Sequence, residues 1–213
     1  MKFKEIKGTI KCITGLRIGG KESTAEIGGV DNPIIRNPLD GMPYIPGSSV
    51  KGKMRFLMEY DLNAVMPDGK PHKCEKDDCK ICAVFGKNAD VKNKDGKLTI
   101  GRAIFRDAFL TEASKNRLIQ YLKETGLNYA ERKMENVINR KKGAAEHPRE
   151  TERVPAGAEF DFSISFRVFK EEDEKLIDDV IVKGLKLIEK DALGASGSRG
   201  YGKVLISYEI VDA

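Results

Sequence analysis

The stretch Phe160-Asp-Phe-Ser-Ile-Ser-Phe-Arg-Val168 decides the fold, because apolar and polar side chains alternate throughout it. Strict alternation predicts a β-strand with one face buried and the other in water. Two other segments carry a similar signal: about Phe3 to Arg17, with Ile6 and Ile10 at even spacing, and Val204 to Ile210. The remaining predicted elements fall between these three strands.

Amphipathic segments predict helices between the strands. Val50, Met54 and Leu57 lie at helical spacing after Ser48 or Ser49, which we expect to cap a helix that ends near Leu62. Further helices are predicted at 112–127 and 176–188, and further strands at 98–100 and 103–105. The order strand, helix, strand, strand, helix, strand predicts an α+β fold of the ferredoxin-like (RRM-like) βαββαβ type. That order alone does not make a protein an RNA binder.

Length and composition fit one domain spanning 1–213, since 213 residues with 40% hydrophobic content leave little room for two cores. The main body is predicted to comprise 1–62, 98–127 and 159–213, with insertions at 63–97 and 128–158. The first residues lack the apolar run of a signal peptide, and charges interrupt every apolar stretch before the ~18 residues needed to cross a bilayer. We therefore expect a cytoplasmic protein with no membrane partner. The formal net charge of +5 favours anionic partners only weakly.

The first insertion carries four candidate metal ligands, His72, Cys74, Cys79 and Cys82. The closing C-x2-C is a spacing of structural zinc sites, and four protein ligands leave no open position for catalysis. Because the segment lacks hydrophobic residues to fold around, zinc would supply its folding energy. Two alternatives stay open: three cysteines with water in place of His72, or a loop that binds nothing. Cys12, alone on the first strand, is predicted to be a buried thiol.

Two segments are compatible with bound phosphate. Pro46 to Arg55 opens a helix with free backbone N–H groups, hydroxyls and three cations, although a plain Ser-capped helix with a solvated basic face explains the same pattern. Gly194 to Gly202 follows a predicted helix and precedes a predicted strand. A dinucleotide-binding loop has the reverse order, so the segment is not predicted to be one. This Gly-rich segment either approaches a ligand, with Arg199 for phosphate and Tyr201 for stacking, or simply links helix and strand.

The second insertion is polar and has a net charge of only +2 between residues 131 and 153, so a solvated face of mixed charge is the default interpretation. Its Gly143-Ala-Ala turn nevertheless predicts a projecting hairpin whose cations contact a phosphate backbone. Asp31 is the candidate catalytic carboxylate. A single Asp in a loop rich in Gly and Pro is ordinarily a turn residue, because acid–base or metal chemistry needs partners nearby.

Three separated motifs carry a resemblance to a known family. The run Ile34-Ile-Arg36-Asn-Pro38-Leu-Asp-Gly41-Met-Pro43-Tyr-Ile-Pro46-Gly-Ser-Ser-Val-Lys-Gly52-Lys-Met-Arg55, together with Gly194 to Gly202, resembles the RAMP superfamily of CRISPR proteins across most of the chain. Asn136 to Arg140 followed by Pro148 to Pro155 is similar to the Cas7-like backbone subunit of the type III-A (Csm) effector complex.

The resemblance implies a ferredoxin-like palm, a thumb hairpin and an insertion that sometimes carries zinc. It implies copies that polymerise along a guide RNA with other type III-A effector subunits, each thumb kinking the duplex of guide and target RNA at a regular interval. In that family a loop Asp after the first strand is required for cutting target RNA with a divalent metal such as Mg²⁺, and Asp31 falls on that position. Asn37 departs from relatives that often carry an acid there.

The resemblance also implies which residues face RNA. They belong to the segment after the first strand, the first helix, the thumb with its base, and the Gly-rich segment. In order along the chain they are Arg17, Gly19, Gly20, Ser49, Lys51, Lys53, Arg55, Arg140, Arg149, Arg153, Gly197, Ser198 and Arg199.

The expected function is therefore that of a repeated backbone subunit that binds guide RNA and cleaves complementary target RNA. Three alternatives stay open: a guide-binding scaffold without catalysis, a guide-processing endoribonuclease of the same superfamily, and a zinc-stabilised interaction domain. The processing enzyme often uses a His general base after the first strand, where this chain has none.

Overall fold

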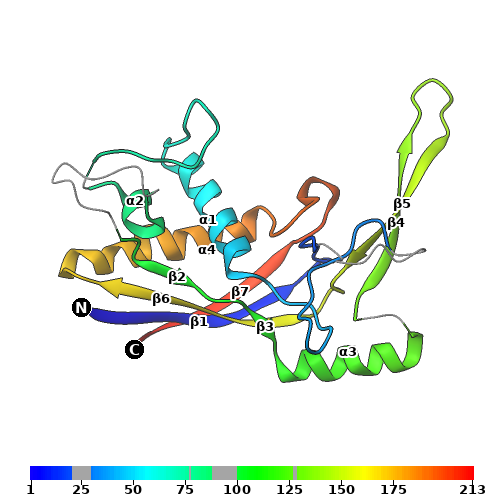
Figure 1. Cartoon of the computed structure of the whole chain (residues 1–213), viewed down its shortest axis with the longest axis horizontal. Coiled ribbons are helices and arrows are strands. Elements are labelled where there is room, and N and C mark those ends of the chain that lie inside the picture. Colours follow the sequence, from blue (N-terminus) through cyan, green and yellow to red (C-terminus); the bar gives the residue numbers. More distant parts are fainter. Residues whose placement is uncertain (21–29, 77, 88–99, 127–128) are drawn as a thin grey trace.

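The computed structural model describes residues 1–20, 30–76, 78–87, 100–126 and 129–213, which form a mixed α+β fold as the sequence predicts. Its main sheet has the strand order β2 (Ala103–Phe105), β6 (Glu159–Val168), β1 (Lys2–Cys12) and β7 (Val204–Asp212), and all neighbours are antiparallel. The short β3 (Phe109–Leu110) also pairs with β6. The first and last strands of the chain are thus neighbours in the sheet (Figure 1).

The pairing register of β1 with β6 and β7 explains how the apolar core forms. Ile6 of β1 lies opposite Ile164 on one side and Ile210 on the other, while Ile10 lies between Phe160 and Ile206. Since side chains alternate along a strand, these apolar rows share one face of the sheet. Ile6, Ile10 and Phe160 are fully buried.

Helices cover that face (Figure 1): α1 (Gly47–Asp61) and α4 (Lys183–Lys190), the latter preceded by the 3₁₀ turn η1 (Glu171–Glu174) and the π-helical turn η2 (Ile177–Val182). The predicted helix over 176–188 is thus present but irregular. A Cβ on Gly184 would lie 2.4 Å from Cγ of Met54, so α1 and α4 approach closely at this glycine. Among the described helices, none is long and apolar enough to cross a membrane.

Several predicted boundaries are wrong. The first strand ends at Cys12 and not at Arg17, because the chain then leaves the sheet and Leu16 bridges to Val154. Neither serine caps α1: the helix begins at Gly47, with Pro46 preceding it and no side-chain cap. In the predicted strand at 98–100, Ile100 is not in a strand, and the two residues before it lie outside the described residues. Cys12 is fully buried as predicted, and burial raises the pKa of its thiol to about 12.

The prediction that the first insertion lacks a hydrophobic contribution is also wrong. It contains a short helix, α2 (Lys80–Phe85), in which Ile81, Val84 and Phe85 are buried in the main core. The rings of Phe85 and Phe105 are stacked, with centroids 6.1 Å apart. Sequence periodicity misses α2 because a run of six residues is too short to establish a period.

The second insertion forms the predicted hairpin, β4 (Glu131–Ile138) paired with β5 (Ala145–Arg153), which projects from the body in Figure 1. Gly143 at its tip has φ +66°, as the turn requires. The helix α3 (Glu112–Thr125) precedes the hairpin, and the Thr111 hydroxyl caps it by accepting a hydrogen bond from the Ser114 N–H. The predicted end of this helix at Leu127 lies outside the described residues.

Candidate nucleic-acid interface

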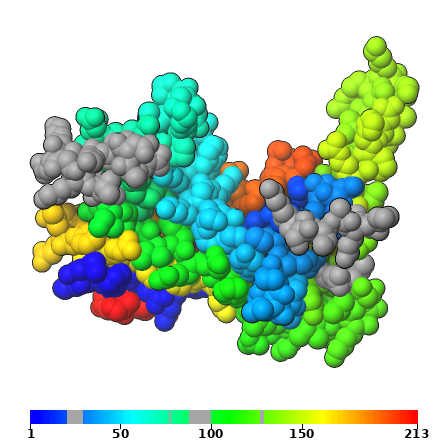
Figure 2. Space-filling view, in the orientation of Figure 1, coloured from blue at the N-terminus to red at the C-terminus, as the bar shows by residue number. Residues whose placement is uncertain are grey.

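Four segments of the chain meet at the foot of the β4–β5 hairpin. Residues 13–20 hydrogen-bond to the loop 30–36 through Ile35 N to Ile18 O (2.9 Å) and to the Gly-rich segment through Ala195 N to Arg17 O (2.8 Å). They also bridge to the end of β5 through Leu16 and Val154. We call this place the hairpin foot. Figure 2 shows the surface hollowed between α1 and the hairpin, with part of the Gly-rich segment (orange) at the bottom of the hollow.

Asp31 lies at the hairpin foot, exposed to solvent. Its Oδ2 accepts a hydrogen bond from the Glu150 N–H of β5 (2.9 Å), while the next residue, Asn32, forms a parallel bridge with Thr151. Arg17 Nη2 donates to the Asn32 side-chain oxygen (2.9 Å). The structure therefore brings Asp31 and Arg17, both predicted site residues, into one neighbourhood. Within the described part of the chain, no cluster of three metal-ligating side chains includes Asp31.

Glu152 holds the Asp31 loop against β5, a role that no sequence signal indicated. Its buried carboxylate accepts hydrogen bonds from Arg36 Nη2 (2.9 Å) and the Ile34 N–H (3.2 Å), and its own N–H donates to Asn32 O (3.1 Å). A sequence shows Glu152 only as one charge among many in a polar stretch. The partners are more than a hundred residues away, so local spacing could not reveal them.

Glu152→Ala should lower the free energy of unfolding by about 3 kcal/mol, because it leaves the Arg36 guanidinium largely buried without its carboxylate. Urea unfolding followed by circular dichroism measures this change. Glu152→Gln, which keeps an oxygen acceptor, should lose clearly less. Equal stability of the Ala variant and the wild type would contradict this role.

The Gly-rich segment packs closely against the residues around it. Gly202 has φ +69°, and a Cβ there would lie 1.9 Å from Leu193 O, so this position requires glycine. Gly197, Ser198 and Arg199 form a short 3₁₀ turn, η3 (Gly197–Arg199). Tyr201 does not offer its ring for base stacking as predicted, because it is 1% exposed.

Charged side chains from the hairpin surround Tyr201. Lys133 Nζ and the Arg153 guanidinium each lie 4.6 Å from the ring centre, and the Tyr201 hydroxyl donates to Glu135 Oε1 (2.5 Å). Glu135 also pairs with Arg199 (3.3 Å). The hydrogen bond from Tyr201 lowers the pKa of Glu135, while burial and that same bond raise the pKa of Tyr201 to about 12.

The structure divides the predicted cations of α1 between two places. Lys53 pairs with Asp191 (2.6 Å), just before the Gly-rich segment. Arg55 instead pairs with Glu59 one turn further along α1 (2.7 Å) and donates to His72 O in the first insertion (2.5 Å). Lys51 is half-buried, and burial followed by repulsion from Arg55 lowers its pKa.

The backbone N–H groups at the start of α1 are also less available to a phosphate than predicted. The Gly47 N–H donates to Asp107 Oδ1 (2.7 Å), so a protein carboxylate already occupies the first amide of the helix. Ser49 is half-buried in the first turn of the helix, and its N–H donates to Pro46 O (2.9 Å). A phosphate at this helix start would have to share the site with Asp107.

The remaining predicted RNA-facing residues lie on either side of the hollow. Arg149 is exposed on β5 and Arg140 at the hairpin tip. Arg153 at the base is half-buried and pairs with Glu131 (2.6 Å). Gly19 and Gly20 border the loop 30–36, where Gly19 bridges to Ile34.

The four predicted metal ligands converge in the first insertion: the ligand atoms of His72, Cys74, Cys79 and Cys82 all lie within 4.8 Å of one another. The Sγ atoms of Cys74 and Cys82 are 3.8 Å apart, and Nε2 of His72 is 3.4 Å from Sγ of Cys79. Zinc with Zn–S bonds of about 2.3 Å at tetrahedral angles would separate two sulfurs by about 3.8 Å. The donor set and its size thus fit a zinc ion.

Groups behind the cluster orient its ligands. His72 Nδ1 lies 2.8 Å from Ala64 O, which leaves Nε2 facing the cysteines, and its backbone N–H donates to Glu59 Oε1 (2.9 Å). Such support is typical of metal-ligating histidines. Cys79 precedes α2 and accepts hydrogen bonds from the thiol and the N–H of Cys82, which lower the pKa of Cys79 to about 4, whereas the pKa of Cys82 is raised.

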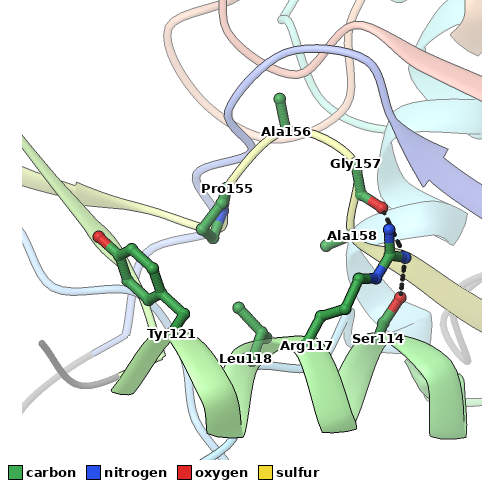
Figure 3. Close-up of a pocket in the computed structure, with 8 residues that line it drawn as sticks. All are labelled: Ser114, Arg117, Leu118, Tyr121, Pro155, Ala156, Gly157 and Ala158. Carbon is green, nitrogen blue, oxygen red and sulfur yellow. Dashed lines mark hydrogen bonds between the residues drawn. The ribbon is translucent and has the colours of Figure 1, made fainter. Parts of the chain in front are cut away.

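A pocket of about 170 Å³ lies between α3 and the link from β5 to β6 (Figure 3). Leu118, Tyr121 and Pro155 line it, and Arg117 at its edge donates to the Ser114 hydroxyl and to Gly157 O (both 3.1 Å). Its lining holds no carboxylate or histidine. The residues that line this pocket therefore offer no carboxylate or imidazole for general acid–base chemistry.

The fold and site define a class of molecule: an α+β protein with a projecting hairpin, a carboxylate at the foot of the hairpin and a Cys₃His cluster. Comparison with known proteins identifies the family. The family model of the RAMP superfamily matches residues 9–205, so the chain belongs to this superfamily. The chain is 43% identical over 217 residues to "CRISPR system Cms endoribonuclease Csm3" of Methanothermobacter thermautotrophicus, covering 96% of this chain and 84% of that protein.

A second Csm3, from Streptococcus thermophilus, is 42% identical over 210 residues, covering 96% of this chain and 88% of the relative. Among solved structures, the crystal structure of the Csm3-Csm4 subcomplex in the type III-A CRISPR-Cas interference complex contains a similar chain, with a TM-score of 0.55 and 26% identity over 99% of this chain and 79% of that one. The chain is thus homologous to Csm3 over nearly its whole length. The resemblance to RAMP proteins and to the type III-A backbone subunit is confirmed.

Proposed function

We propose that this protein is the repeated backbone subunit of a type III-A CRISPR ribonucleoprotein that binds guide RNA and cleaves complementary target RNA at regular intervals. The observation that carries the proposal is the exposed Asp31 carboxylate, held by β5 at the foot of the projecting β4–β5 hairpin, in a chain homologous to Csm3 endoribonucleases. The main sheet with α1 and α4 acts as the ferredoxin-like palm and the β4–β5 hairpin as the thumb.

The partners follow from the same proposal. Guide RNA runs through the hollow between α1 and the thumb, bound through its phosphates and shape and not its sequence. Target RNA pairs with the guide, neighbouring copies continue the filament, and other type III-A subunits, such as the Csm4 of the similar complex, complete it. The assembled complex acts in the cytoplasm.

Cleavage requires an aligned phosphate and a proton acceptor. The thumb distorts the target, which places a 2′-hydroxyl in line with its neighbouring phosphate, and the Asp31 carboxylate orients this hydroxyl and accepts its proton. The 2′-oxygen bonds to phosphorus as the bond from phosphorus to the 5′-oxygen breaks, and the leaving 5′-oxygen takes a proton from water. Oδ2 is held by the Glu150 N–H, so Oδ1 is the oxygen that faces RNA. Among the described residues, the divalent metal implied by the family would find no group of three protein ligands that includes Asp31, so RNA and water would have to complete its shell.

We assign a structural zinc ion to His72, Cys74, Cys79 and Cys82. The ligand spacing supports this assignment, and so does the attachment of the cluster to α1 through Arg55 and Glu59. With four protein ligands the site has no position left for substrate, so zinc stabilises the first insertion and takes no part in cleavage.

The test assembles the protein on a guide with its partner subunits, adds labelled complementary RNA with Mg²⁺, and resolves the products on a sequencing gel. Evenly spaced cuts are expected in complementary RNA and none in a non-complementary RNA of the same length. Binding without cutting would identify a guide-holding scaffold. Shortening of the guide precursor instead of the target would identify a processing enzyme.

A further inference from the structure

Tyr201 is buried outside the main apolar core. It is 1% exposed, yet it does not belong to the contiguous core of described apolar residues beneath the sheet. Its neighbours are charged groups of the hairpin, with Lys133 and Arg153 against its ring and Glu135 at its hydroxyl. A residue whose only task is to fill space would not need the hydroxyl, since phenylalanine fills nearly the same volume.

The contacts of Tyr201 join two parts of the proposed RNA site. Tyr201 follows η3, the turn that contains Gly197, Ser198 and Arg199, whereas Lys133 and Glu135 lie on β4. Arg199 makes a second link to the same Glu135 carboxylate (3.3 Å). The strand β4 is therefore fixed to the Gly-rich segment by a buried aromatic ring with cations on it and by two polar bonds to one carboxylate.

The other strand of the hairpin is fixed to Asp31. Oδ2 of Asp31 accepts from Glu150 N–H on β5, and β5 is paired along its length with β4. A rotation of the hairpin about its base would consequently move Asp31 relative to the Gly-rich segment. The bond between Tyr201 and Glu135 opposes that rotation.

We propose that Tyr201 is a positioning residue, whose hydrogen bond to Glu135 sets the angle of the thumb so that Asp31 meets the target phosphate. This inference rests on the proposed function, because it assumes that the Gly-rich segment supports the guide and that Asp31 cleaves. Tyr201 itself touches neither RNA nor the reacting atoms. Its effect passes through Glu135 and the two hairpin strands.

The test compares Tyr201→Phe with the wild type in the assembled complex. Phe keeps the ring between Lys133 and Arg153 and removes only the bond to Glu135. The matched control is Tyr208→Phe, a half-buried tyrosine on β7 for which the described part of the chain provides no hydrogen bond to its hydroxyl. Target affinity, the single-turnover rate constant of cutting, thermal stability and hydrogen exchange of the β4 amides are measured for all three proteins.

For Tyr201→Phe we expect target affinity within twofold of the wild type and a rate constant lower by roughly tenfold, since small misplacements of a reacting group reduce rates strongly while binding persists. Exchange of the β4 amides should be faster, and Tyr208→Phe should behave like the wild type. Glu135→Ala combined with Tyr201→Phe should be no slower than Glu135→Ala alone, because the alanine already removes the acceptor of the Tyr201 bond.

Cutting and β4 exchange that are both unchanged in Tyr201→Phe would overturn the proposal. An equal loss of affinity and rate, together with a lower melting temperature, would also overturn it, because that pattern indicates a purely structural tyrosine. A wild type that binds target but does not cut would refute the proposed nuclease function instead. In that case unchanged exchange would still refute thumb positioning, and faster exchange would support it.

Discussion

Replacing Asp31 by Asn should slow the cutting of target RNA by at least about 100-fold, the typical contribution of a positioned acid–base group, while guide and target binding stay within twofold. Asn keeps an oxygen that can accept the Glu150 N–H, so the Asp31 loop should hold its place on β5. What Asn loses is the negative charge that accepts a proton. The expected loss is therefore one of rate and not of affinity.

The measurement is single-turnover cleavage of end-labelled target RNA by the assembled complex, with a filter-binding assay on the same preparations. Asp40→Asn is the matched control, because Asp40 is also an exposed loop aspartate whose Oδ1 accepts a nearby backbone N–H, that of Met42 (3.0 Å). The control should cut like the wild type. An Asp31→Asn variant that also cuts at the wild-type rate would show that another group performs the chemistry.

Replacing Cys79 by Ser should release zinc and lower the melting temperature by roughly 10 °C, without abolishing RNA binding. The fall in stability follows from α2, which starts directly after Cys79 and places Ile81, Val84 and Phe85 in the main core. Ser is itself a good residue for the position before a helix, so the variant removes a metal ligand while keeping a cap for α2. RNA binding persists because the hairpin foot is built from other segments.

Zinc content by atomic absorption and a thermal melt of each variant test this expectation. Cys12→Ala is the control, since Cys12 is a fully buried thiol on β1 and not one of the four clustered ligands, and it should keep its zinc. One zinc per chain in Cys79→Ser would contradict the four-ligand site. Zinc lost with no change in melting temperature would contradict the link between the metal and α2.

Prediction from sequence succeeded where the signal is local. The alternation in β6 identified a half-buried strand because successive side chains of a strand point to opposite faces. The spacing of His72, Cys74, Cys79 and Cys82 identified one cluster because ligands within eleven residues can reach a common ion without help from the rest of the fold. The turn at Gly143 located the hairpin for a similar reason.

The errors arose where a distant partner determines the outcome. β1 ends early because Leu16 pairs with Val154, and the start of α1 is occupied by Asp107, sixty residues further along the chain. Tyr201 looked available for stacking, yet Lys133 and Arg153 of the hairpin cover its ring. No sequence pattern pointed to Glu152, because its role depends on the hydrogen bonds that it accepts from Arg36 and Ile34, far away in the chain.

The sequence by itself thus determined the three long strands β1, β6 and β7, the amphipathic helices, the hairpin and the ligand set of the metal cluster, since each depends on residues a few positions apart. Only the tertiary structure decided that Arg17, Asp31, Glu152 and Tyr201 meet at the hairpin foot. Such tertiary contacts depend on strand pairing and on which buried charges find partners, and these are properties of the whole packed chain that local spacing does not encode.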